Sequence, residues 1–171
     1  MNLSSLTAHM QIDKPFDIIK FNHVSVTGRR GFNSAVYKGN GFSALLYPNG
    51  SAVILGCKNC DLLESIANEL AALADAKVIS PPMVTNQVYS GMITRPIVYA
   101  RIPAVLRDAG FTVSYEPELF PVVLITSNSY KGKMQLFASG KYVITGVVSE
   151  SEASTLCERV VQALYVFAER E

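Results

Sequence analysis

Two stretches in the second half of the chain decide its fold: YEPELFP at residues 115–121 and LFASGKYVITG at residues 136–146. The first puts two glutamates and two prolines around a phenylalanine, which is the composition of a turn next to a strand. The second has apolar runs on both sides of Ser139-Gly140, which is typical of a hairpin. Each stretch therefore holds a phenylalanine, Phe120 or Phe137, beside a turn.

The first half of the chain repeats this pattern, so we interpret the sequence as an internal repeat. The matches are Phe32 with Phe120, Leu46-Tyr47-Pro48-Asn49-Gly50 with Leu136-Phe137-Ala138-Ser139-Gly140, Val53-Ile54-Leu55-Gly56 with Val143-Ile144-Thr145-Gly146, and Asn22-His23-Val24 with Asn86-Gln87-Val88. The second half is longer mainly between Asn86 and Phe120, where an inserted helix accounts for the extra residues.

Hydrophobic periodicity predicts a mixture of strands and helices. A helix is expected from Asn59, a candidate N-cap, to about residue 75, and another from the capping-box pair Ser149 and Glu152 onward. The expected strands are 20–27, 43–56, 84–94, 97–101, 120–126 and 133–147, and a short helix is expected at 104–109. Pro81-Pro82 is expected to break the chain between the two halves.

Composition limits the protein class without naming a partner. The 171 residues suit one compact domain or two joined half-domains, and the net charge of +1 neither favours nor excludes a polyanion. Three cysteines without scaffold spacing favour a reducing compartment. No signal peptide and no run of about 18 apolar residues is present, so we expect a soluble intracellular protein. Residues 1–19 are interpreted as an N-terminal tail or an added strand of low order.

The sequence gives little support for metal or catalytic chemistry. Cys57 and Cys60 form one CxxC pair, which is half of a zinc site without its second half. Phosphate-binding glycine loops and nucleophile motifs are missing, and no carboxylate is spaced with a histidine or serine for acid-base work. We therefore predict no cofactor, no metal and no enzymatic activity.

The stretches 115–121 and 136–146 resemble the second repeat of the TATA-binding protein family, and the resemblance extends in register over residues 20–171. It implies an α+β fold of two repeats, 20–80 and 81–171, each a curved antiparallel sheet of a saddle with helices on the convex face. The first repeat is abbreviated, because residues 27–31 are too short for the family's first helix.

The resemblance also implies a set of DNA contacts in the minor groove. Phe32 and Tyr47 would wedge one end of the site and Phe120 and Phe137 the other. Asn22 and Asn86 would donate to adenine and thymine acceptors, unless they only cap turns. The full implied DNA-binding set is Asn22, Val24, Phe32, Lys38, Tyr47, Val53, Asn86, Val88, Phe120, Phe137, Val143 and Thr145.

Glu116 and Glu118 would face a TFIIB-type initiation factor by resemblance, although a solvated turn explains them equally well. Several positions depart from the family: Lys38, Leu55, Thr126 and Gln135 on the DNA face, and an acidic helix between Lys58 and Lys77.

Two functions therefore stay open. The first is a nuclear initiation factor that binds and bends A·T-rich duplex DNA. The second is a protein-interaction module of the same fold that has lost DNA binding. Self-association through the apolar face is possible in either case.

Overall fold

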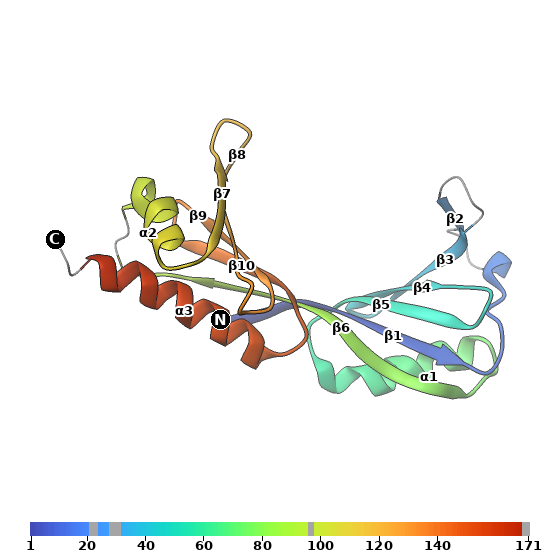
Figure 1. Cartoon of the computed structure of the whole chain (residues 1–171). Helices are drawn as coiled ribbons and strands as arrows, with labels where there is room; N and C mark the ends of the chain where they lie inside the picture. The colour runs from blue at the N-terminus through green and yellow to red at the C-terminus, as the bar shows by residue number, and fades with distance from the viewer. Residues whose placement is uncertain (21–23, 28–31, 96–97, 169–171) are drawn as a thin grey trace. The chain divides into compact units, whose positions relative to one another are not determined.

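The computed structural model describes the chain except for residues 21–23, 28–31, 96–97 and 169–171. The chain divides into two compact units. We call Ser5–Asn86 the N-terminal unit, and Met1–Ser4 together with Gln87–Glu171 the C-terminal unit. Strands β1 (Asn2–Ile12) and β6 (Val78–Met92) contribute residues to both units (Figure 1).

The N-terminal unit is an antiparallel sheet with one long helix. Its strand order is β2-β3-β4-β5-β1-β6. Besides β1 and β6, this unit contains β2 (Val24–Thr27), β3 (Phe32–Gly39), β4 (Phe42–Leu46), β5 (Ser51–Cys57), the short 3-10 helices η1 (Ile18–Lys20) and η2 (Cys60–Leu62), and α1 (Leu63–Leu73). The predicted cap is confirmed, since Asn59 Oδ1 accepts a hydrogen bond from the Asp61 N–H.

The core of the N-terminal unit follows from period-two burial in its strands. Leu6, Leu46 and Ile54 are fully buried, while their neighbours along each strand are partly exposed. α1 places Ile66 and Leu70 in the same core. Burying an aliphatic side chain of this size stabilises the fold by about 1.5–3 kcal/mol, before the entropy of ordering is subtracted.

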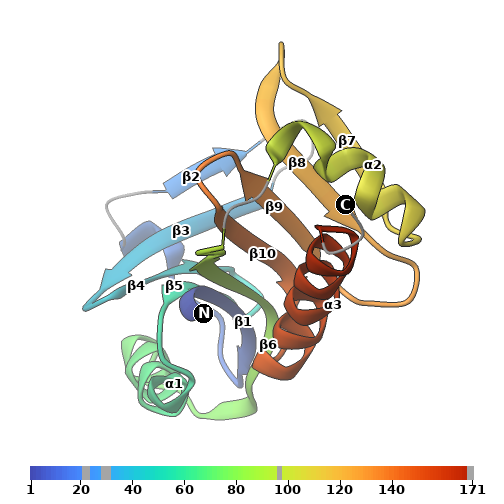
Figure 2. The same ribbon diagram turned by 90° about the vertical axis from the view of Figure 1, so that its left-hand side faces the viewer.

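The C-terminal unit has the strand order β1-β6-β10-β9-β8-β7. Its further elements are η3 (Tyr99–Arg101), α2 (Ile102–Asp108), β7 (Thr112–Glu116), β8 (Phe120–Thr126), β9 (Lys133–Phe137), β10 (Lys141–Val147) and α3 (Glu150–Ala168). Leu106 of α2 and Leu156 of α3 share one hydrophobic cluster with Val123 and Leu136 of the sheet. Both helices therefore cover the same face of this sheet (Figure 2).

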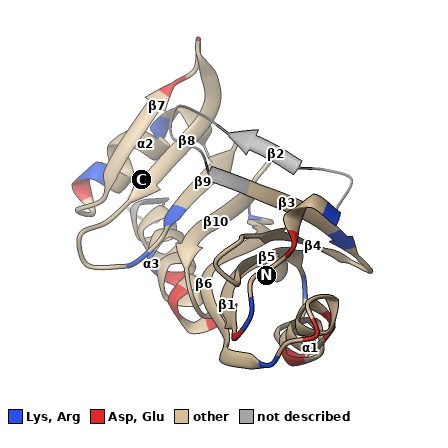
Figure 3. Cartoon of the chain, turned by 90° about the vertical axis from the view of Figure 1, so that its right-hand side faces the viewer, with Lys and Arg blue, Asp and Glu red and all other residues tan. Residues whose placement is uncertain are grey.

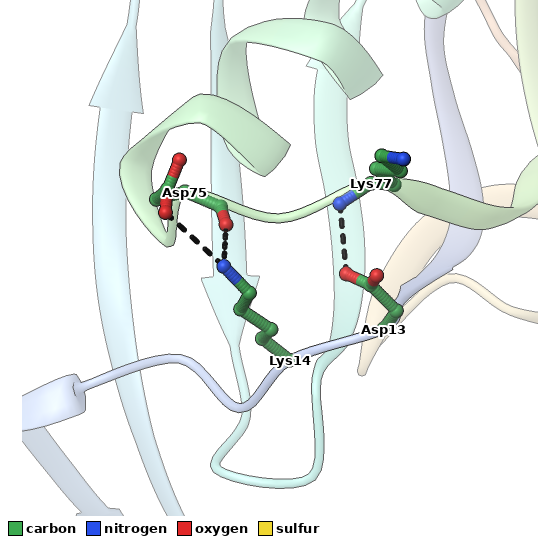
Figure 4. Close-up of polar contacts among 4 residues, drawn as sticks. All are labelled: Asp13, Lys14, Asp75 and Lys77. Atoms are coloured by element: carbon green, nitrogen blue, oxygen red, sulfur yellow. Dashed lines mark hydrogen bonds and ion pairs between the residues drawn. The ribbon is translucent and has the colours of Figure 1, made fainter.

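Of the two alternatives for the first residues, the added strand is found: they form β1, which is well paired rather than of low order. Leu6, Ala8, Met10 and Ile12 are buried in alternation with more exposed residues, and β1 pairs antiparallel with β5. Its end is fixed to the turn after α1 by the four residues in Figure 4. Asp13 Oδ1 accepts from the Lys77 N–H at 2.8 Å, and Lys14 Nζ binds the carbonyl of Asp75 and its carboxylate, the latter at 3.1 Å.

Two further expectations differ from the structure. β6 runs through Pro81-Pro82 without a break. β6 pairs with β10 only from Gln87 to Met92, so Pro81 and Pro82 lie in the part of β6 that forms the edge of the N-terminal unit. An edge strand tolerates proline, because the missing N–H would have had no partner strand on that side. The expected strand at 97–101 is instead the 3-10 turn η3, which leads directly into α2.

Candidate nucleic-acid interface

The two units share one strand register, and this relates their candidate residues. In β3 and β4, Ala35 lies opposite Leu46 and Lys38 lies opposite Ser43. In β8 and β9, Val123 lies opposite Leu136 and Thr126 lies opposite Lys133. Phe32 and Phe120 therefore begin equivalent strands, and Tyr47 and Phe137 stand at equivalent ends of the next ones.

Each sheet has one face that its helices do not cover, which we call the open face. In the C-terminal unit, Val123, Ile125, Met134, Leu136 and Ile144 point into the helix-covered core. The residues between them must point the other way, because successive side chains of a strand alternate between faces. The open face of this unit therefore carries Phe120, Leu124, Gln135, Phe137, Val143 and Thr145, with Val88 and Ser90 from β6.

Phe120 and Phe137 are neighbours on this open face. Val122 lies opposite Phe137, and Phe120 stands two residues before Val122 on the same strand. The Phe120 side chain is 54% exposed, although it is a large apolar group, while Phe137 is partly buried. Gly140, with φ of +82°, makes the tight turn after Phe137. Two phenylalanines on the same face at the end of a strand pair are what an apolar wedge requires.

The N-terminal unit has an open face of the same design. The Tyr37 hydroxyl donates to Glu69 on α1 at 2.7 Å, so Tyr37 points toward the helix and Lys38 toward the open face. Leu45 lies opposite Val53, and Ser43 lies opposite Leu55, which adds these side chains to the same face. Tyr47 follows β4 and is partly exposed. The side chains of Phe32 and Val24 lie outside the described residues, as does all of Asn22.

The expected match of Asn22-His23-Val24 with Asn86-Gln87-Val88 does not hold. β2 pairs with β3 in the same way as β7 pairs with β8, so Val24 belongs to the outer strand and not to an equivalent of β6. The equivalent of β6 is β1, because each pairs with the corresponding strand of its unit. Leu6 of β1 lies opposite Cys57 of β5, and Gln87 of β6 lies opposite Val147 of β10. Ser5 therefore stands where the C-terminal unit has the partly exposed Asn86.

The signal for β1 was present in the sequence. Leu6, Ala8, Met10 and Ile12 alternate with polar residues, which is the pattern of a half-buried strand.

Glu116 and Glu118 are both exposed at the turn between β7 and β8. The turn is closed by a hydrogen bond from the Leu119 N–H to the Glu116 carbonyl at 3.0 Å, so the two carboxylates are displayed on an ordered backbone. Neither carboxylate forms an ion pair with a residue that the structure describes. A protein contact at this turn stays a prediction.

Charge is distributed unequally over the elements (Figure 3). Lys38, Lys133 and Lys141 are exposed at the ends of strands, where they could approach phosphates beside the open faces. Lys131 is less available, because its Nζ lies 3.2 Å from Glu152 Oε1. α1 carries Glu64 and Glu69 with no basic residue in its last turn, so this helix would repel a phosphate backbone.

The Glu152 carboxylate also completes the predicted cap of α3. It accepts from the Val148 N–H at 2.9 Å, while the Ser149 hydroxyl accepts from the Glu152 N–H at 3.2 Å. The bond from Val148, helped by Lys131, lowers the pKa of Glu152 below its ordinary value, and slight burial opposes this. The predicted capping box is thus present, with Val148 as the donor to Glu152.

We predict that Glu152→Gln lowers the free energy of unfolding near neutral pH and makes that free energy depend less on pH. Because the folded state lowers this pKa, the carboxylate stabilises the fold above its unfolded pKa and ceases to do so as the pH falls through its folded pKa. Urea unfolding of both proteins from pH 7 down to pH 3 measures this. Ser149→Ala is the control, because the stability that this variant loses should not depend on pH. Parallel curves for Glu152→Gln and wild type would contradict the assignment.

The described residues give little support for a metal site or a membrane span. Among them, no group of three histidine, cysteine or acidic side chains could hold a metal ion. Cys57 is buried and Cys60 is exposed, and neither forms a disulfide. Over the same ranges, no helix is long and apolar enough to cross a membrane.

Comparison with known proteins agrees with this geometry. The family model described as "Transcription factor TFIID (or TATA-binding protein, TBP)" matches residues 82–167. The TATA-box-binding protein of Pyrobaculum islandicum is 32% identical over 127 residues, which cover 71% of this chain and 62% of that protein. The TATA-box-binding protein of Pyrococcus furiosus is 29% identical over 125 residues, covering 70% and 63%. The chain thus spans less than two thirds of these relatives.

A solved structure, Methanococcus jannaschii TBP, superposes with a TM-score of 0.77 over 96% of this chain and 97% of its own. At 19% identity this similarity shows the fold, which is the expected α+β fold with an open antiparallel sheet. The family model covers half of the chain, and we therefore conclude that the chain belongs to the TATA-binding protein family.

Proposed function

We propose that this protein binds A·T-rich duplex DNA through the minor groove, bends it, and so nucleates a transcription initiation complex. The observation that carries the proposal is the open face of the C-terminal unit, where the half-exposed Phe120 adjoins Phe137 at the end of a strip of partly exposed valines. The names of the relatives, TATA-box-binding proteins, agree with this assignment.

The chemistry of the open face suits the minor groove of A·T pairs. Val88 and Val143 present methyl groups that can displace groove water and lie against the base edges. Asn86 can donate from its amide to the adenine N3 and thymine O2 acceptors, which are the only polar groups that A·T pairs show there. Phe120 and Phe137 would enter a base step and unstack it, and the resulting bend brings more of the duplex onto the sheet.

A second candidate keeps the fold but replaces DNA by a protein partner. Gln135 interrupts the apolar strip between Leu124 and Val143, and Thr126 offers no positive charge at the end of β8. The acidic surface of α1 also removes one route to phosphate contacts. These three features favour a protein-interaction module.

A DNA titration separates the two candidates. We expect binding to an A·T-rich duplex at least about tenfold tighter than to a G·C-rich duplex, since each unfavourable pair costs about 1–3 kcal/mol. Affinity should fall with salt with a slope of about −3 to −5 in a log–log plot, because only a few lysines flank the described parts of the open faces. Fluorescence anisotropy from 50 to 200 mM salt measures both quantities.

Absence of binding to either duplex at low salt, at protein concentrations well above about 10 μM, would favour the interaction module instead, since even non-specific binding normally reaches that range. A TFIIB-type factor that joins the DNA complex only when Glu116 and Glu118 are intact would identify the predicted partner contact. A protein with this function works where the genome is transcribed, which in a eukaryotic host is the nucleus.

A further inference from the structure

Strands β1 and β6 end in the same way in the two units. The Ile12 N–H donates to the Gly50 carbonyl at 3.0 Å, and the Ile93 N–H donates to the Gly140 carbonyl at 2.9 Å. Ile12 and Ile93 are therefore equivalent residues. Each is followed by two polar residues, and these differ in charge between the two units.

In the N-terminal unit the two residues are Asp13 and Lys14, and both are engaged within that unit (Figure 4). Asp13 Oδ1 accepts from the Lys77 N–H at 2.8 Å. Lys14 Nζ lies 3.1 Å from the Asp75 carboxylate and also donates to the Asp75 carbonyl. The positive charge of Lys14 is thus compensated by Asp75.

In the C-terminal unit the two residues are Thr94 and Arg95, and Arg95 is exposed. The Arg95 guanidinium carbon lies 4.9 Å from the centroid of the Tyr165 ring on α3. This cation–π contact orients the guanidinium but gives it no oxygen to bond. In the part of the chain that the structure describes, Arg95 forms no hydrogen bond and no ion pair. Its N–H groups are therefore available to a ligand.

Arg95 lines a cavity of about 330 Å³, where the turn between β9 and β10 meets the end of β6. Thr94 and Ser139 bring hydroxyl groups to the same cavity, and Phe137 forms part of its apolar wall. Guanidinium and hydroxyl groups can all donate hydrogen bonds. Among the described residues that line the cavity, none carries a negative charge. A cavity with this lining suits an anion.

Phe137 connects the cavity with the proposed DNA site. Its ring is one of the two that would enter a base step, and each strand of a duplex carries a phosphate about every 3.4 Å. A base step that receives the Phe137 ring therefore brings its own phosphates toward the cavity that this ring lines. A guanidinium can bind two oxygens of one phosphate through parallel N–H groups.

We propose that Arg95, assisted by Thr94 and Ser139, binds a DNA backbone phosphate next to the base step that Phe137 enters. The inference rests on the proposed function and deepens it, because it adds a phosphate site at the loop after β6. The Tyr165 ring already orients the guanidinium, so less side-chain entropy is lost when the phosphate binds.

Arg95→Gln tests the site through the salt dependence of DNA binding. The variant loses one phosphate contact, so the slope of log affinity against log salt should become less negative by about 0.9. Affinity for an A·T-rich duplex at low salt should fall about fivefold, which is the range of a charge pair at an exposed site. Fluorescence anisotropy measures both quantities, and circular dichroism confirms folding.

Arg159→Gln is the matched control. Arg159 is also an exposed arginine of the C-terminal unit, but it bonds Gln162 on α3 and does not line the cavity. Its replacement removes the same charge, so any general effect of net charge appears in both variants. We expect the slope and the affinity of Arg159→Gln to stay as in wild type.

Neutral phosphate analogues locate the contact on the DNA. Methylphosphonates replace single phosphates, one at a time, and each duplex is titrated with wild type and with Arg95→Gln. A fluorescent adenine analogue identifies the unstacked step. Wild type should lose about fivefold in affinity at one phosphate next to that step. Arg95→Gln should lose nothing further at this phosphate, because the contact is already missing, and should match wild type at the others.

Three results would overturn the proposal: a wild-type slope in Arg95→Gln, an equal change of slope in Arg159→Gln, or the same methylphosphonate profile for wild type and Arg95→Gln. A wild-type protein that binds no duplex at low salt would instead overturn the proposed function, and this inference with it. The two failures are thus distinguishable.

Discussion

Replacing Phe120 and Phe137 together by alanine is expected to abolish DNA bending and to weaken binding to an A·T-rich duplex about 100-fold. The two side chains lie on the same face of neighbouring strands, and Phe120 is 54% exposed, so little folding stability depends on its ring. Without the wedges, the base steps stay stacked and the straight duplex meets less of the sheet. Energy transfer between dyes at the two DNA ends measures the bend directly.

Leu119→Ala is the matched control for this experiment. Leu119 is the neighbour of Phe120, is 81% exposed and is also apolar, but it lies in the turn before β8. Its replacement removes a similar exposed group and should leave the bend as in wild type. A double phenylalanine variant that still bends DNA like the wild type would exclude the wedge role.

Gly140→Ala is expected to destabilise the protein by roughly 3 kcal/mol, the sum of a left-handed backbone at an alanine and an overpacked contact. Gly140 has φ of +82°, and an added Cβ would lie 2.5 Å from the carbonyl oxygen of Ile93. The contact cannot open easily, because the Ile93 N–H donates to the Gly140 carbonyl at 2.9 Å. Urea unfolding measures the loss.

Gly110→Ala separates the two contributions within the same unit. Gly110 has φ of +86°, but nothing lies within 4 Å of an added Cβ. Only the cost of a left-handed backbone at an alanine should remain, so the free energy of unfolding should fall by about 1 kcal/mol. Equal losses at the two glycines would show that the Ile93 contact relaxes without cost. Because Gly140 also shapes the turn after Phe137, its alanine variant should weaken DNA binding as well.

The second half of the fold could be predicted from sequence because its signals are local. The stretches 115–121 and 136–146 carry their own turn residues and alternating apolar positions, and β8, β9 and β10 begin and end at or near the expected residues. The positions of Phe120 and Phe137 follow from that register. The glycine and proline positions fix the hairpins before any distant contact forms.

At the start of the chain the alternating pattern indicates a strand but not its place in the sheet. β1 contains serine, threonine and histidine, and its stability comes from β5 and β6, which lie far along the sequence. Asn22-His23-Val24 is the stretch most similar in sequence to Asn86-Gln87-Val88, although the structurally equivalent strand, β1, contains serine in place of Asn86. Side-chain pairs such as Lys131 with Glu152 depend on loop geometry, which the sequence pattern does not specify.

The place of β1 between β5 and β6 has a consequence for synthesis on the ribosome. Residues 2–12 are translated well before their neighbours in the sheet, Ser51–Cys57 and Val78–Met92. A strand that waits for distant partners raises the contact order and slows folding, and its apolar side stays accessible to chaperones meanwhile. A nascent chain halted before residue 78 should therefore remain sensitive to protease within residues 2–12.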